Sequence, residues 1–359
     1  MIHFRSLRFK ISLSIFIVAL LPFLSLSLIF YVQAKQSTKD LLENSMGELS
    51  HEVGIEIERT IFNAKRHIKA LSENPIIKST RVENEEKLRE MHKIQNFFHL
   101  FEDIILVNSE GIVIASTEYD YQGDWKSEKW FQQSVKGECV ISPVHAIPSP
   151  FRTVITATAP LYGEDGKVYA VIGGQINMKE IWDITDRVKI GKTGFVFLID
   201  NEGNLIASPY KYKHLNPLKS DSLRKKIVSH NSGVTHYIND KNSKRICYYR
   251  VMQGYQEYKG LGWGIGIVQD IEEAYAMINR IQMHILLVAI AGFIIIIILA
   301  NLLSHHILKP IKTLPKVIDK IARGDLDIRM KVKSNDEIGD LGKAFNKMAG
   351  DLRRTRASL

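Results

Sequence analysis

The stretch Ile104-Ile-Leu-Val-Asn-Ser-Glu-Gly-Ile-Val-Ile-Ala-Ser116 recurs in altered form as Val196-Phe-Leu-Ile-Asp-Asn-Glu-Gly-Asn-Leu-Ile-Ala-Ser208, at a constant offset of 92 residues. Both copies contain Glu-Gly and Ile-Ala-Ser, and their apolar positions align on either side of the Glu-Gly pair. Each copy has two apolar runs separated by Asn or Asp with Gly, a pattern that predicts a β-hairpin. A repeat of this length indicates one structural module used twice.

Further strand-like segments follow each hairpin. They cover residues 152–161 and 167–178 after the first copy, and residues 233–238, 245–251 and 263–269 after the second. We interpret Gly264 and Gly266 as strand glycines, because no phosphate-binding turn into a helix follows them. We therefore expect an α+β fold with two tandem antiparallel sheets, each with a helix or loop layer on one face.

A long helix is expected before the first module. Apolar residues between positions 34 and 72 recur at alternating intervals of four and three, with one stutter, which predicts a packed or coiled seam. The seam residues are Leu42, Met46, Leu49, Val53, Ile57, Ile61, Ala64, Ile68 and Leu71. Asn74-Pro75 is expected to end the helix, because the residue before a proline disfavours helical geometry. We expect a mast helix over residues 34–73, a distal module over about 83–185 and a proximal module over about 190–270.

Two apolar blocks, residues 11–32 and 284–304, are long enough to cross a membrane, which takes about 20 residues. Cationic residues precede the first block and follow the second, so residues 1–10 and the segment after 304 are expected in the cytoplasm, and 33–283 outside it. A cleaved signal peptide is the alternative for the first block, but its length and the later block favour a retained anchor. We expect a multi-pass protein of the inner (plasma) membrane, in contact with lipid.

The formal net charge of +9 does not indicate nucleic-acid binding, because the cationic residues are scattered and partly flank the apolar blocks. Cys139 and Cys247 are the only cysteines, and they fall in different modules. A disulfide suits an oxidising compartment, but two separate buried thiols are our expectation. No His pair has metal-ligand spacing with a nearby acid, so we expect neither a metal site nor a cofactor.

The segment after the second block, residues 305–357, is expected to form two short helices. The first carries an apolar stripe and ends at Gly324, an extended piece follows, and Asp336 is placed to cap the second. The two stripes consist of Ile311, Leu314, Ile318 and Ile321, and of Ile338, Leu341, Phe345, Met348 and Leu352. Two such helices cannot bury their stripes alone, so we expect a homodimer that joins them in a four-helix bundle.

In this order of segments the chain resembles the sensory half of bacterial transmembrane receptors, in which a double Cache sensor domain is followed by a HAMP coupler. The PAS-like Cache pattern is carried by residues 128–131 (EKWF), 154–162 (VITATAPLY), 166–176 (GKVYAVIGGQI), 194–200 (GFVFLID) and 262–270 (GWGIGIVQD). The HAMP pattern is carried by Pro310, by Gly324 with the two residues after it, and by residues 336–339, which include Glu337 and Gly339. The resemblance implies that these last positions relay the signal.

The resemblance also implies a pocket for a small extracellular molecule in the distal module. Trp130 stands where the family has a pocket Trp, and Phe131 stands where a Tyr is usual. Members that resemble amino-acid receptors have an Arg two residues before this Trp and an Asp in the last strand. Glu128 and Gln175 occupy those two positions here. Both charged anchors for an α-amino acid are therefore missing, which argues against that class of ligand.

The residues between 121 and 175 also suit a small-molecule site, which needs apolar walls and a few directed polar groups. The aromatic candidates are Tyr121, Trp125, Trp130, Phe131, Phe151 and Tyr162, and the polar candidates are Lys126, His145, Arg152, Thr153 and Gln175. Arg152 offers a bidentate contact to a carboxylate, so a small carboxylate is one hypothesis for the ligand. In the alternative interpretation Trp130 and Phe151 are ordinary core residues and Arg152 is a solvated loop residue.

Two short motifs resemble catalytic or phosphate-binding signatures, but their positions and neighbouring residues do not fit those functions. Residues 50–53 (SHEV) resemble the phospho-acceptor box of histidine kinases, but they lie in the extracytoplasmic mast helix and no ATP-binding module follows. Residues 191–193 (GKT) resemble the end of a phosphate-binding loop, but Asp186 replaces the glycine that such a loop requires. We identify no catalytic residue, so enzymatic activity would belong to an output module beyond these residues.

These features together predict a dimeric transmembrane receptor that senses a small molecule and passes the signal through the HAMP segment to a cytoplasmic output. A sensor histidine kinase is the first expectation for the full-length protein. The alternatives are a chemotaxis transducer, a nucleotide cyclase and a receptor without an output that acts through mixed dimers with a partner receptor. An extracellular enzyme on a membrane anchor is disfavoured because no catalytic set stands out.

Overall fold

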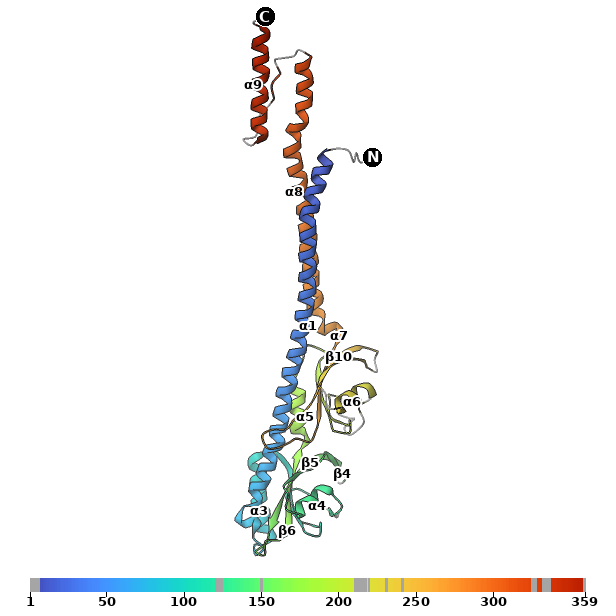
Figure 1. The fold of residues 1–359 in the computed structure, drawn as a ribbon. Coiled ribbons are helices and arrows are strands. Elements are labelled where there is room, and N and C mark those ends of the chain that lie inside the picture. The colour runs from blue at the N-terminus through green and yellow to red at the C-terminus, as the bar shows by residue number, and fades with distance from the viewer. Residues whose placement is uncertain are drawn as a thin grey trace. The chain divides into compact units, whose positions relative to one another are not determined.

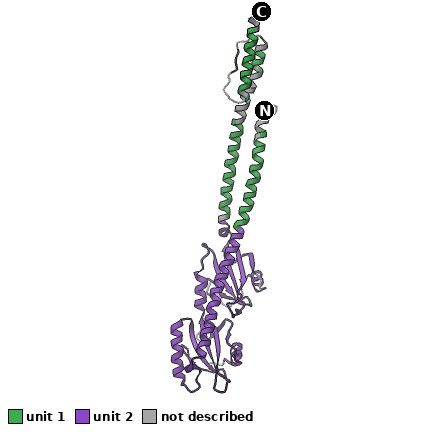
Figure 2. Cartoon of the chain, turned by 60° about the vertical axis from the view of Figure 1, so that its left-hand side comes forward, with its two compact units in different colours: residues 1–38, 278–359 green, residues 39–277 purple. Residues whose placement is uncertain are grey.

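The computed structural model describes residues 7–119, 125–148, 151–209, 218, 220–229, 232–239, 242–323, 328–330 and 337–357 (Figure 1). The chain divides into two compact units (Figure 2). One unit comprises residues 39–277, and the other comprises residues 1–38 with 278–359. The first unit holds both sheets and the second holds both apolar segments.

Helix α1 (Leu7–Ser72) is one continuous helix that contains both the first apolar block and the predicted mast. Its seam is buried as expected, with Val53, Ile57, Ile61 and Ile68 in the main core. The helix ends just before Asn74, whose side-chain oxygen accepts a 2.8 Å hydrogen bond from the Ile76 N–H and so caps helix α2 (Pro75–Lys78). The predicted stop at Asn74-Pro75 is therefore confirmed.

The distal module is an antiparallel sheet in the order β2-β1-β6-β5-β3, with β4 also paired to β5. Its strands are β1 (Phe101–Asn108), β2 (Val113–Ser116), β3 (Val140–Ile141), β4 (His145–Pro148), β5 (Phe151–Tyr162) and β6 (Val168–Asn177). Helices α1 and α3 (Asn84–Phe98) lie on one face of this sheet, and α4 (Lys129–Val135) lies on the other (Figure 1). Gly174 of β6 allows α1 to approach closely, because a Cβ there would lie 2.5 Å from the Ile68 Cδ1 atom.

The proximal module repeats this arrangement with the strand order β8-β7-β11-β10-β9. Its elements are α5 (Met178–Arg187), β7 (Phe195–Ile199), β8 (Leu205–Ala207), α6 (Asp221–Val228), β9 (Gly233–Ile238), β10 (Lys244–Val251) and β11 (Gly264–Asp270). In both modules the repeated hairpin forms one edge, and the last strand of the module pairs beside it. The two predicted tandem antiparallel modules are confirmed.

The repeat extends to the turns of the two hairpins. Asn108 accepts hydrogen bonds from the backbone N–H groups of Glu110 and Ile112, and Asp200 accepts the equivalent bonds from Glu202 and Asn204. The glycine of each turn, Gly111 or Gly203, has a φ near +90° (92° and 89°). Only glycine adopts this conformation readily, which explains why the glycine is identical in both copies.

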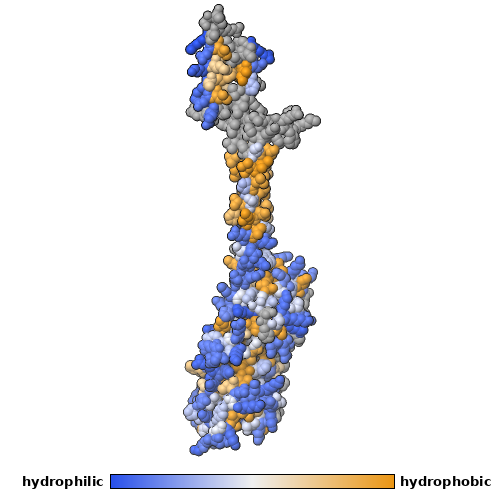
Figure 3. All heavy atoms as spheres, in the orientation of Figure 1, coloured by the Kyte–Doolittle hydropathy of each residue, from blue (hydrophilic) through white to orange (hydrophobic). Residues whose placement is uncertain are grey.

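Two helical segments are long and apolar enough to cross a membrane, Phe16–Ser72 and Ile278–Leu302. Their apolar side chains form the orange band of Figure 3. The second segment lies in helix α8 (Ala276–Ala322). Within this unit the Phe16 and Phe293 rings meet edge to face with centroids 5.7 Å apart, and Gly292 makes room for Phe23. The side-chain surroundings of Pro310 lie outside the described residues, although its backbone continues α8.

The sequence of residues 271–283 predicts one helix that runs directly into the second apolar block, and this prediction is wrong in one detail. Helix α7 (Ile271–Ala274) stops at Tyr275, and α8 begins at the next residue. The cause is local, because the Tyr275 backbone leaves the helical region, with φ −95° and ψ 1°. The helical stretch is therefore interrupted at Tyr275.

The C-terminal segment contains helix α9 (Glu337–Ala357). Its residue Asn346 exchanges two hydrogen bonds with the Met330 backbone, at 2.7 Å and 2.9 Å. Phe345 is buried, whereas Leu341, Met348 and Leu352 of the predicted stripe are exposed. Exposed stripe residues agree with the expected homodimer, which stays a prediction, and Gly324 and Asp336 lie outside the described residues.

Candidate functional site

The distal sheet carries a row of polar side chains across three strands. Asp103 of β1 pairs with Gln175 of β6, and Gln175 pairs in turn with Thr156 of β5. Paired residues of adjacent strands point to the same face of a sheet. All three side chains have 0% exposure. Burying a polar row costs free energy unless its groups form hydrogen bonds. A bound ligand can supply such bonds, so this face is a candidate binding site.

Asp103 holds the segment that follows β2. Its carboxylate accepts hydrogen bonds from the Ser116 hydroxyl, from the N–H and hydroxyl of Thr117, and from the Glu118 N–H, all between 2.8 Å and 3.1 Å. These donors stabilise the buried charge and fix the chain as it enters Tyr119. Asp103 therefore shapes one wall of the site.

Helix α4 covers the adjoining part of the same face. Trp130 and Phe131 are each 2% exposed and pack in one cluster with Ile105 and Val171 of the sheet. Trp125 adds a third aromatic ring, 5.2 Å from the Trp130 ring between centroids. This cluster anchors α4 to the sheet and leaves the indole N–H of Trp130 buried on the same face as the polar row.

His145, at the start of β4, lies beside Trp130. The two rings are stacked, with centroids 6.3 Å apart and planes 26° apart. Its Nδ1 atom lies 3.1 Å from the carbonyl oxygen of Pro143 and 3.3 Å from the Ser142 hydroxyl. Burial lowers the pKa of His145, outweighing the bond to Pro143 and the charge of Glu128, which both raise it. The imidazole is therefore neutral at pH 7.

Arg152 brings a cation to the edge of the site. Its side chain is 8% exposed, its guanidinium lies 3.6 Å from the Tyr119 ring centroid, and its Nη1 atom lies 3.6 Å from a Glu102 carboxylate oxygen. On β5 it shares a face with Thr156, since side chains alternate along a strand. The site thus combines aromatic walls, a cation and hydroxyl, amide and imidazole groups.

Three buried polar atoms of this face have no hydrogen-bond partner among the residues that the structure describes: Trp130 Nε1, His145 Nε2 and Thr156 Oγ1. A buried polar group left without a partner costs about 1–3 kcal/mol. Such groups are rare in native proteins and point to a bound molecule or water. Their presence on one face, from three different elements, marks this face as the candidate binding site.

The same row in the proximal module is apolar. The 92-residue offset of the repeat places Phe195 where the distal module has Asp103. Phe195 of β7 pairs with Val268 of β11, and Val268 pairs with Cys247 of β10, so these three residues correspond to the distal row. Val268 and Cys247 are fully buried, and the Cys247 thiol is free. The two modules therefore share a fold but differ at the row that makes the distal site polar.

The structure brings together several of the predicted ligand-binding residues and separates others. Gln175 is part of the polar row itself, and Trp125, Trp130, Phe131 and Arg152 lie on the same face of the sheet. Thr153 lies on the opposite face of β5, by alternation with Arg152. Tyr121 and the Phe151 side chain lie outside the described residues. The ligand-binding role of all these residues stays a prediction.

Two residues of the row, Asp103 and Thr156, were missed by the sequence analysis. The signal for Thr156 is the alternation of Arg152, Thr156 and Thr158 at even positions of β5, which predicts a polar face on a strand. Thr158 is confirmed as part of this face by a 2.6 Å hydrogen bond to Ser134 of α4. No comparable pattern marks Asp103, because its neighbours on the same face of β1 are apolar.

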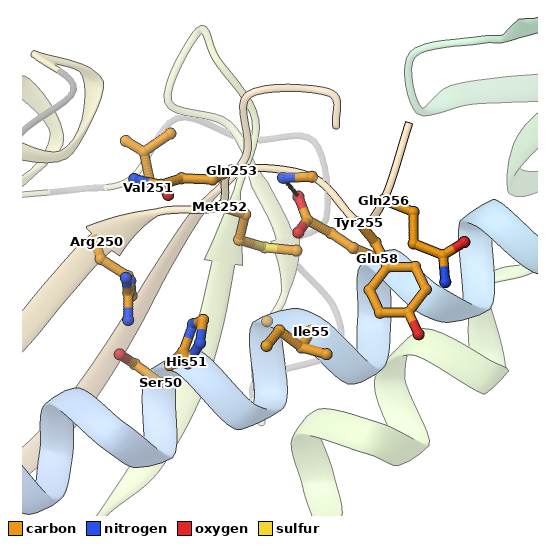
Figure 4. A pocket seen from close by; sticks show the side chains of 12 residues that line it. Ser50, His51, Ile55, Glu58, Arg250, Val251, Met252, Gln253, Tyr255 and Gln256 are labelled. Carbon is orange, nitrogen blue, oxygen red and sulfur yellow. Dashed lines mark hydrogen bonds between the residues drawn. The ribbon is translucent and has the colours of Figure 1, made fainter. Parts of the chain in front are cut away.

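A cavity of about 160 Å³ lies between α1 and the connection from β10 to β11 (Figure 4). Glu58 of α1 enters it, is 3% exposed and accepts a 2.6 Å hydrogen bond from the Gly254 N–H. Burial raises the pKa of Glu58, and the bond from Gly254 opposes this rise. The cavity lies where the proximal module packs against α1.

Comparison with known proteins agrees with this architecture. A family model for the Cache domain matches residues 33–278, and one for the HAMP domain matches residues 302–354. The methyl-accepting chemotaxis protein PctB of Pseudomonas aeruginosa is 26% identical over 247 residues, which cover 67% of this chain and 38% of PctB. The methyl-accepting chemotaxis protein McpA of Bacillus subtilis is 30% identical over 227 residues, 62% of this chain and 32% of McpA.

Among solved structures, the ligand-binding domain of the Pseudomonas fluorescens chemoreceptor CtaA in complex with L-isoleucine has the same fold. It superposes with a TM-score of 0.54 at 15% identity and covers 68% of this chain and 98% of that domain. This chain spans less than half the length of PctB and McpA, at 38% and 32%. From its two modules of equal strand order and these family matches, the chain belongs to the Cache domain family and carries a HAMP domain after its sensor.

Proposed function

We propose that this chain is the sensory half of a methyl-accepting chemotaxis transducer. The support is the description of its relatives PctB and McpA, both methyl-accepting chemotaxis proteins. The sensor histidine kinase that the sequence suggested first is not confirmed. In this proposal residues 33–283 face the outside of the inner membrane, and the HAMP segment controls a signalling module attached to Leu359 in a homodimer.

The observation that carries the sensory part of the proposal is the contrast between the two modules. The distal module has a buried row of Asp103, Gln175 and Thr156, whereas the equivalent proximal row is apolar. Small-molecule sites combine apolar walls with a few directed polar groups. We therefore assign ligand binding to the distal module, between the sheet, α4 and β4.

The relay from this site follows the chain. Gln175 lies two residues before the end of β6, and α5 begins at Met178, directly after that strand. Trp182 of α5 donates a 3.0 Å hydrogen bond to the Ile206 carbonyl of β8, so α5 links the end of β6 to the proximal sheet. Glu273 of α7 accepts bonds from the Lys192 and Thr193 N–H groups before β7. A ligand that shifts β6 would also shift α5 and, through the proximal sheet, α7. In this proposal the chain exists in two packing arrangements of these elements, and the ligand changes their relative populations.

The ligand is proposed to be a small carboxylate held by Arg152. The CtaA domain was solved with L-isoleucine, but Glu128 and Gln175 occupy the two positions where amino-acid receptors of this family carry charged anchors. A bidentate Arg–carboxylate contact requires only one cation and suits the edge of the site. The charged α-amino group of an amino acid would find Gln175, a neutral amide, in place of a carboxylate.

Reading the coding sequence beyond codon 359 tests the proposed output. A long run of heptad repeats with a helical hairpin supports a chemotaxis transducer. A phospho-acceptor helix followed by an ATP-binding module would overturn the proposal in favour of a sensor kinase. A stop codon directly after Leu359 would also overturn it and favour a receptor that acts through mixed dimers.

A further inference from the structure

The hydrogen bonds around His145 determine which of its ring nitrogens carries the proton. The Ser142 hydroxyl donates to the Pro143 carbonyl at 2.8 Å, so its single hydrogen is not available to His145. The same hydroxyl oxygen accepts from the Thr156 N–H at 2.8 Å. The Pro143 carbonyl, 3.1 Å from His145 Nδ1, can only accept. Nδ1 is therefore the protonated nitrogen, and Nε2 carries a lone pair.

This lone pair is a buried acceptor within the candidate site. The Nε2 atom is fully buried and has no hydrogen-bond partner within the described part of the chain. Burial also keeps the ring neutral by lowering its pKa. The other two unpartnered groups of this face differ in kind, since the Trp130 indole N–H only donates and the Thr156 hydroxyl both donates and accepts.

The strand register places Arg152 within reach of the same ligand. His145 of β4 pairs with Val154 of β5, and Arg152 and Thr156 flank Val154 on the same face of β5. Side chains in such diagonal positions have Cα atoms roughly 7–8 Å apart. The two side chains therefore project from neighbouring positions on one face, where one small molecule can contact both the guanidinium and the imidazole.

We propose that His145 is the specificity-determining hydrogen-bond acceptor of the distal site, and that the site selects a small carboxylate with a hydroxyl group on the adjacent carbon. The carboxylate pairs with Arg152, the hydroxyl hydrogen is donated to His145 Nε2, and the hydroxyl oxygen accepts from Trp130 or Thr156. This inference rests on the ligand site of the proposed function and names the chemical class that the site accepts.

A protonated amine in place of the hydroxyl is disfavoured by the charges nearby. His145 is neutral, and Gln175 is an amide in the centre of the row. Asp103 accepts from Ser116, Thr117 and Glu118, and Glu102 pairs with Arg152. Both nearby carboxylates already have partners, so an ammonium group in the site would pay the desolvation cost of a buried charge without gaining a dedicated ion pair.

Three matched probes test the proposal: L-lactate, propanoate and L-alanine, which differ only in a hydroxyl, a hydrogen or an ammonium on the second carbon. Binding is measured by titration calorimetry on the full chain in phosphatidylethanolamine–phosphatidylglycerol nanodiscs at pH 7.5. We expect L-lactate to bind about tenfold more tightly than propanoate, the ratio that one hydrogen bond of about 1.4 kcal/mol gives. L-alanine is expected to bind no better than propanoate.

Variants then assign the preference to His145. His145→Phe keeps a flat ring but removes the acceptor, so L-lactate affinity should fall about tenfold to that of propanoate, with propanoate unchanged. His145→Gln retains an acceptor oxygen and should recover part of the preference. His236→Phe, at an exposed histidine of β9, is the matched control and should leave all three affinities unchanged. Circular dichroism melting of each variant separates lost binding from lost folding.

Each outcome decides the proposal. Failure of the wild-type chain to bind L-lactate, or tighter binding of L-alanine, overturns the ligand class. A lactate preference that persists in His145→Phe overturns the role of His145. Lactate binding with the predicted preference, in a chain whose gene continues into a kinase, would leave the inference intact and overturn only the proposed output.

Discussion

Glu58 of α1 accepts a 2.6 Å hydrogen bond from the backbone N–H of Gly254, a residue 196 positions further along the chain. Gly260 of the same loop lies close to this carboxylate, because a Cβ there would be 2.7 Å from the Glu58 Oε1 atom. Tyr258, in the same loop, has a pKa raised by burial and by the Glu58 charge. The proximal module is thus tied to the helix through a buried carboxylate (Figure 4).

The titration of Glu58 predicts how its substitution depends on pH. Because burial raises its pKa above the ordinary value of 4.5, the folded chain binds this proton more tightly than the unfolded chain. Its contribution to stability is therefore fully present below pH 4.5 and is lost as the pH rises through the folded pKa. Glu58→Gln keeps an acceptor for Gly254 and removes the charge, so it should stabilise the chain at pH 7.5 by about 1 kcal/mol.

Thermal unfolding of the full chain in nanodiscs at pH 7.5 and pH 4 measures this effect. The gain from Glu58→Gln should shrink at the lower pH, where the wild-type residue is protonated. Glu52→Gln, at an exposed position of the same helix, is the control and should change little at either pH. A Glu58→Gln chain that is less stable than wild type at pH 7.5 would show that the folded state needs the charge.

Trp182→Phe is expected to weaken the relay between the modules while sparing the ligand site. The change removes the N–H donor to the Ile206 carbonyl but keeps an aromatic ring in α5. Ligand affinity should change less than about twofold, whereas the loss of one hydrogen bond, worth about 1 kcal/mol, should reduce the signalling response. Calorimetry and a signalling assay on the same variant separate the two quantities. Equal loss of binding and response would place Trp182 in the ligand site instead.

Changes of length between Met283 and Pro310 should lock signalling in one state. Helix α8 is continuous through this segment, and one inserted or deleted residue rotates everything after it by about 100°. The expected result of a one- or two-residue change is a response fixed on or off, while a seven-residue insertion restores the facing residues and should restore regulation. Regulation that persists after every single-residue change would rule out a helical link.

The exposed stripe of α9 predicts contact between two copies of the chain. Leu341 is 47% exposed and apolar, so Leu341→Cys should form a disulfide-linked dimer under mild oxidation in membranes. Lys347→Cys, on an exposed polar position of the same helix, is the control and should cross-link several-fold less. Non-reducing electrophoresis measures both. Equal cross-linking at the two positions would argue against a bundle packed through the stripe.

Much of the fold was predictable because local sequence patterns determine its turns and its long helix. The turn between the repeated strands requires a glycine with positive φ, which made the Glu-Gly pairs visible 92 residues apart. The seam of α1 was equally visible, since burial on one helical face imposes its spacing. The break at Tyr275 was not predictable, because neither glycine nor proline marks it.

The site was predictable only in part. Trp130 and Arg152 stand out in the sequence, but the polar row depends on register: Asp103 pairs with Gln175, and Gln175 pairs with Thr156. Nothing in the sequence around Asp103 states which residue of a distant strand it will face. The proton position on His145 likewise depends on the carbonyl of Pro143, which only the folded chain places next to its ring.

The most direct test of a ligand site in the distal module joins residues 1–359 to the signalling module of a chemotaxis transducer and measures kinase activity in cells that lack their own receptors. We predict that L-lactate changes kinase activity in this hybrid, and that Trp130→Ala and Arg152→Ala each shift the half-maximal concentration at least about tenfold. Lys226→Ala, in α6 of the proximal module, should leave the response unchanged. A response that survives both distal substitutions, or that is lost in Lys226→Ala alone, would contradict a ligand site in the distal module.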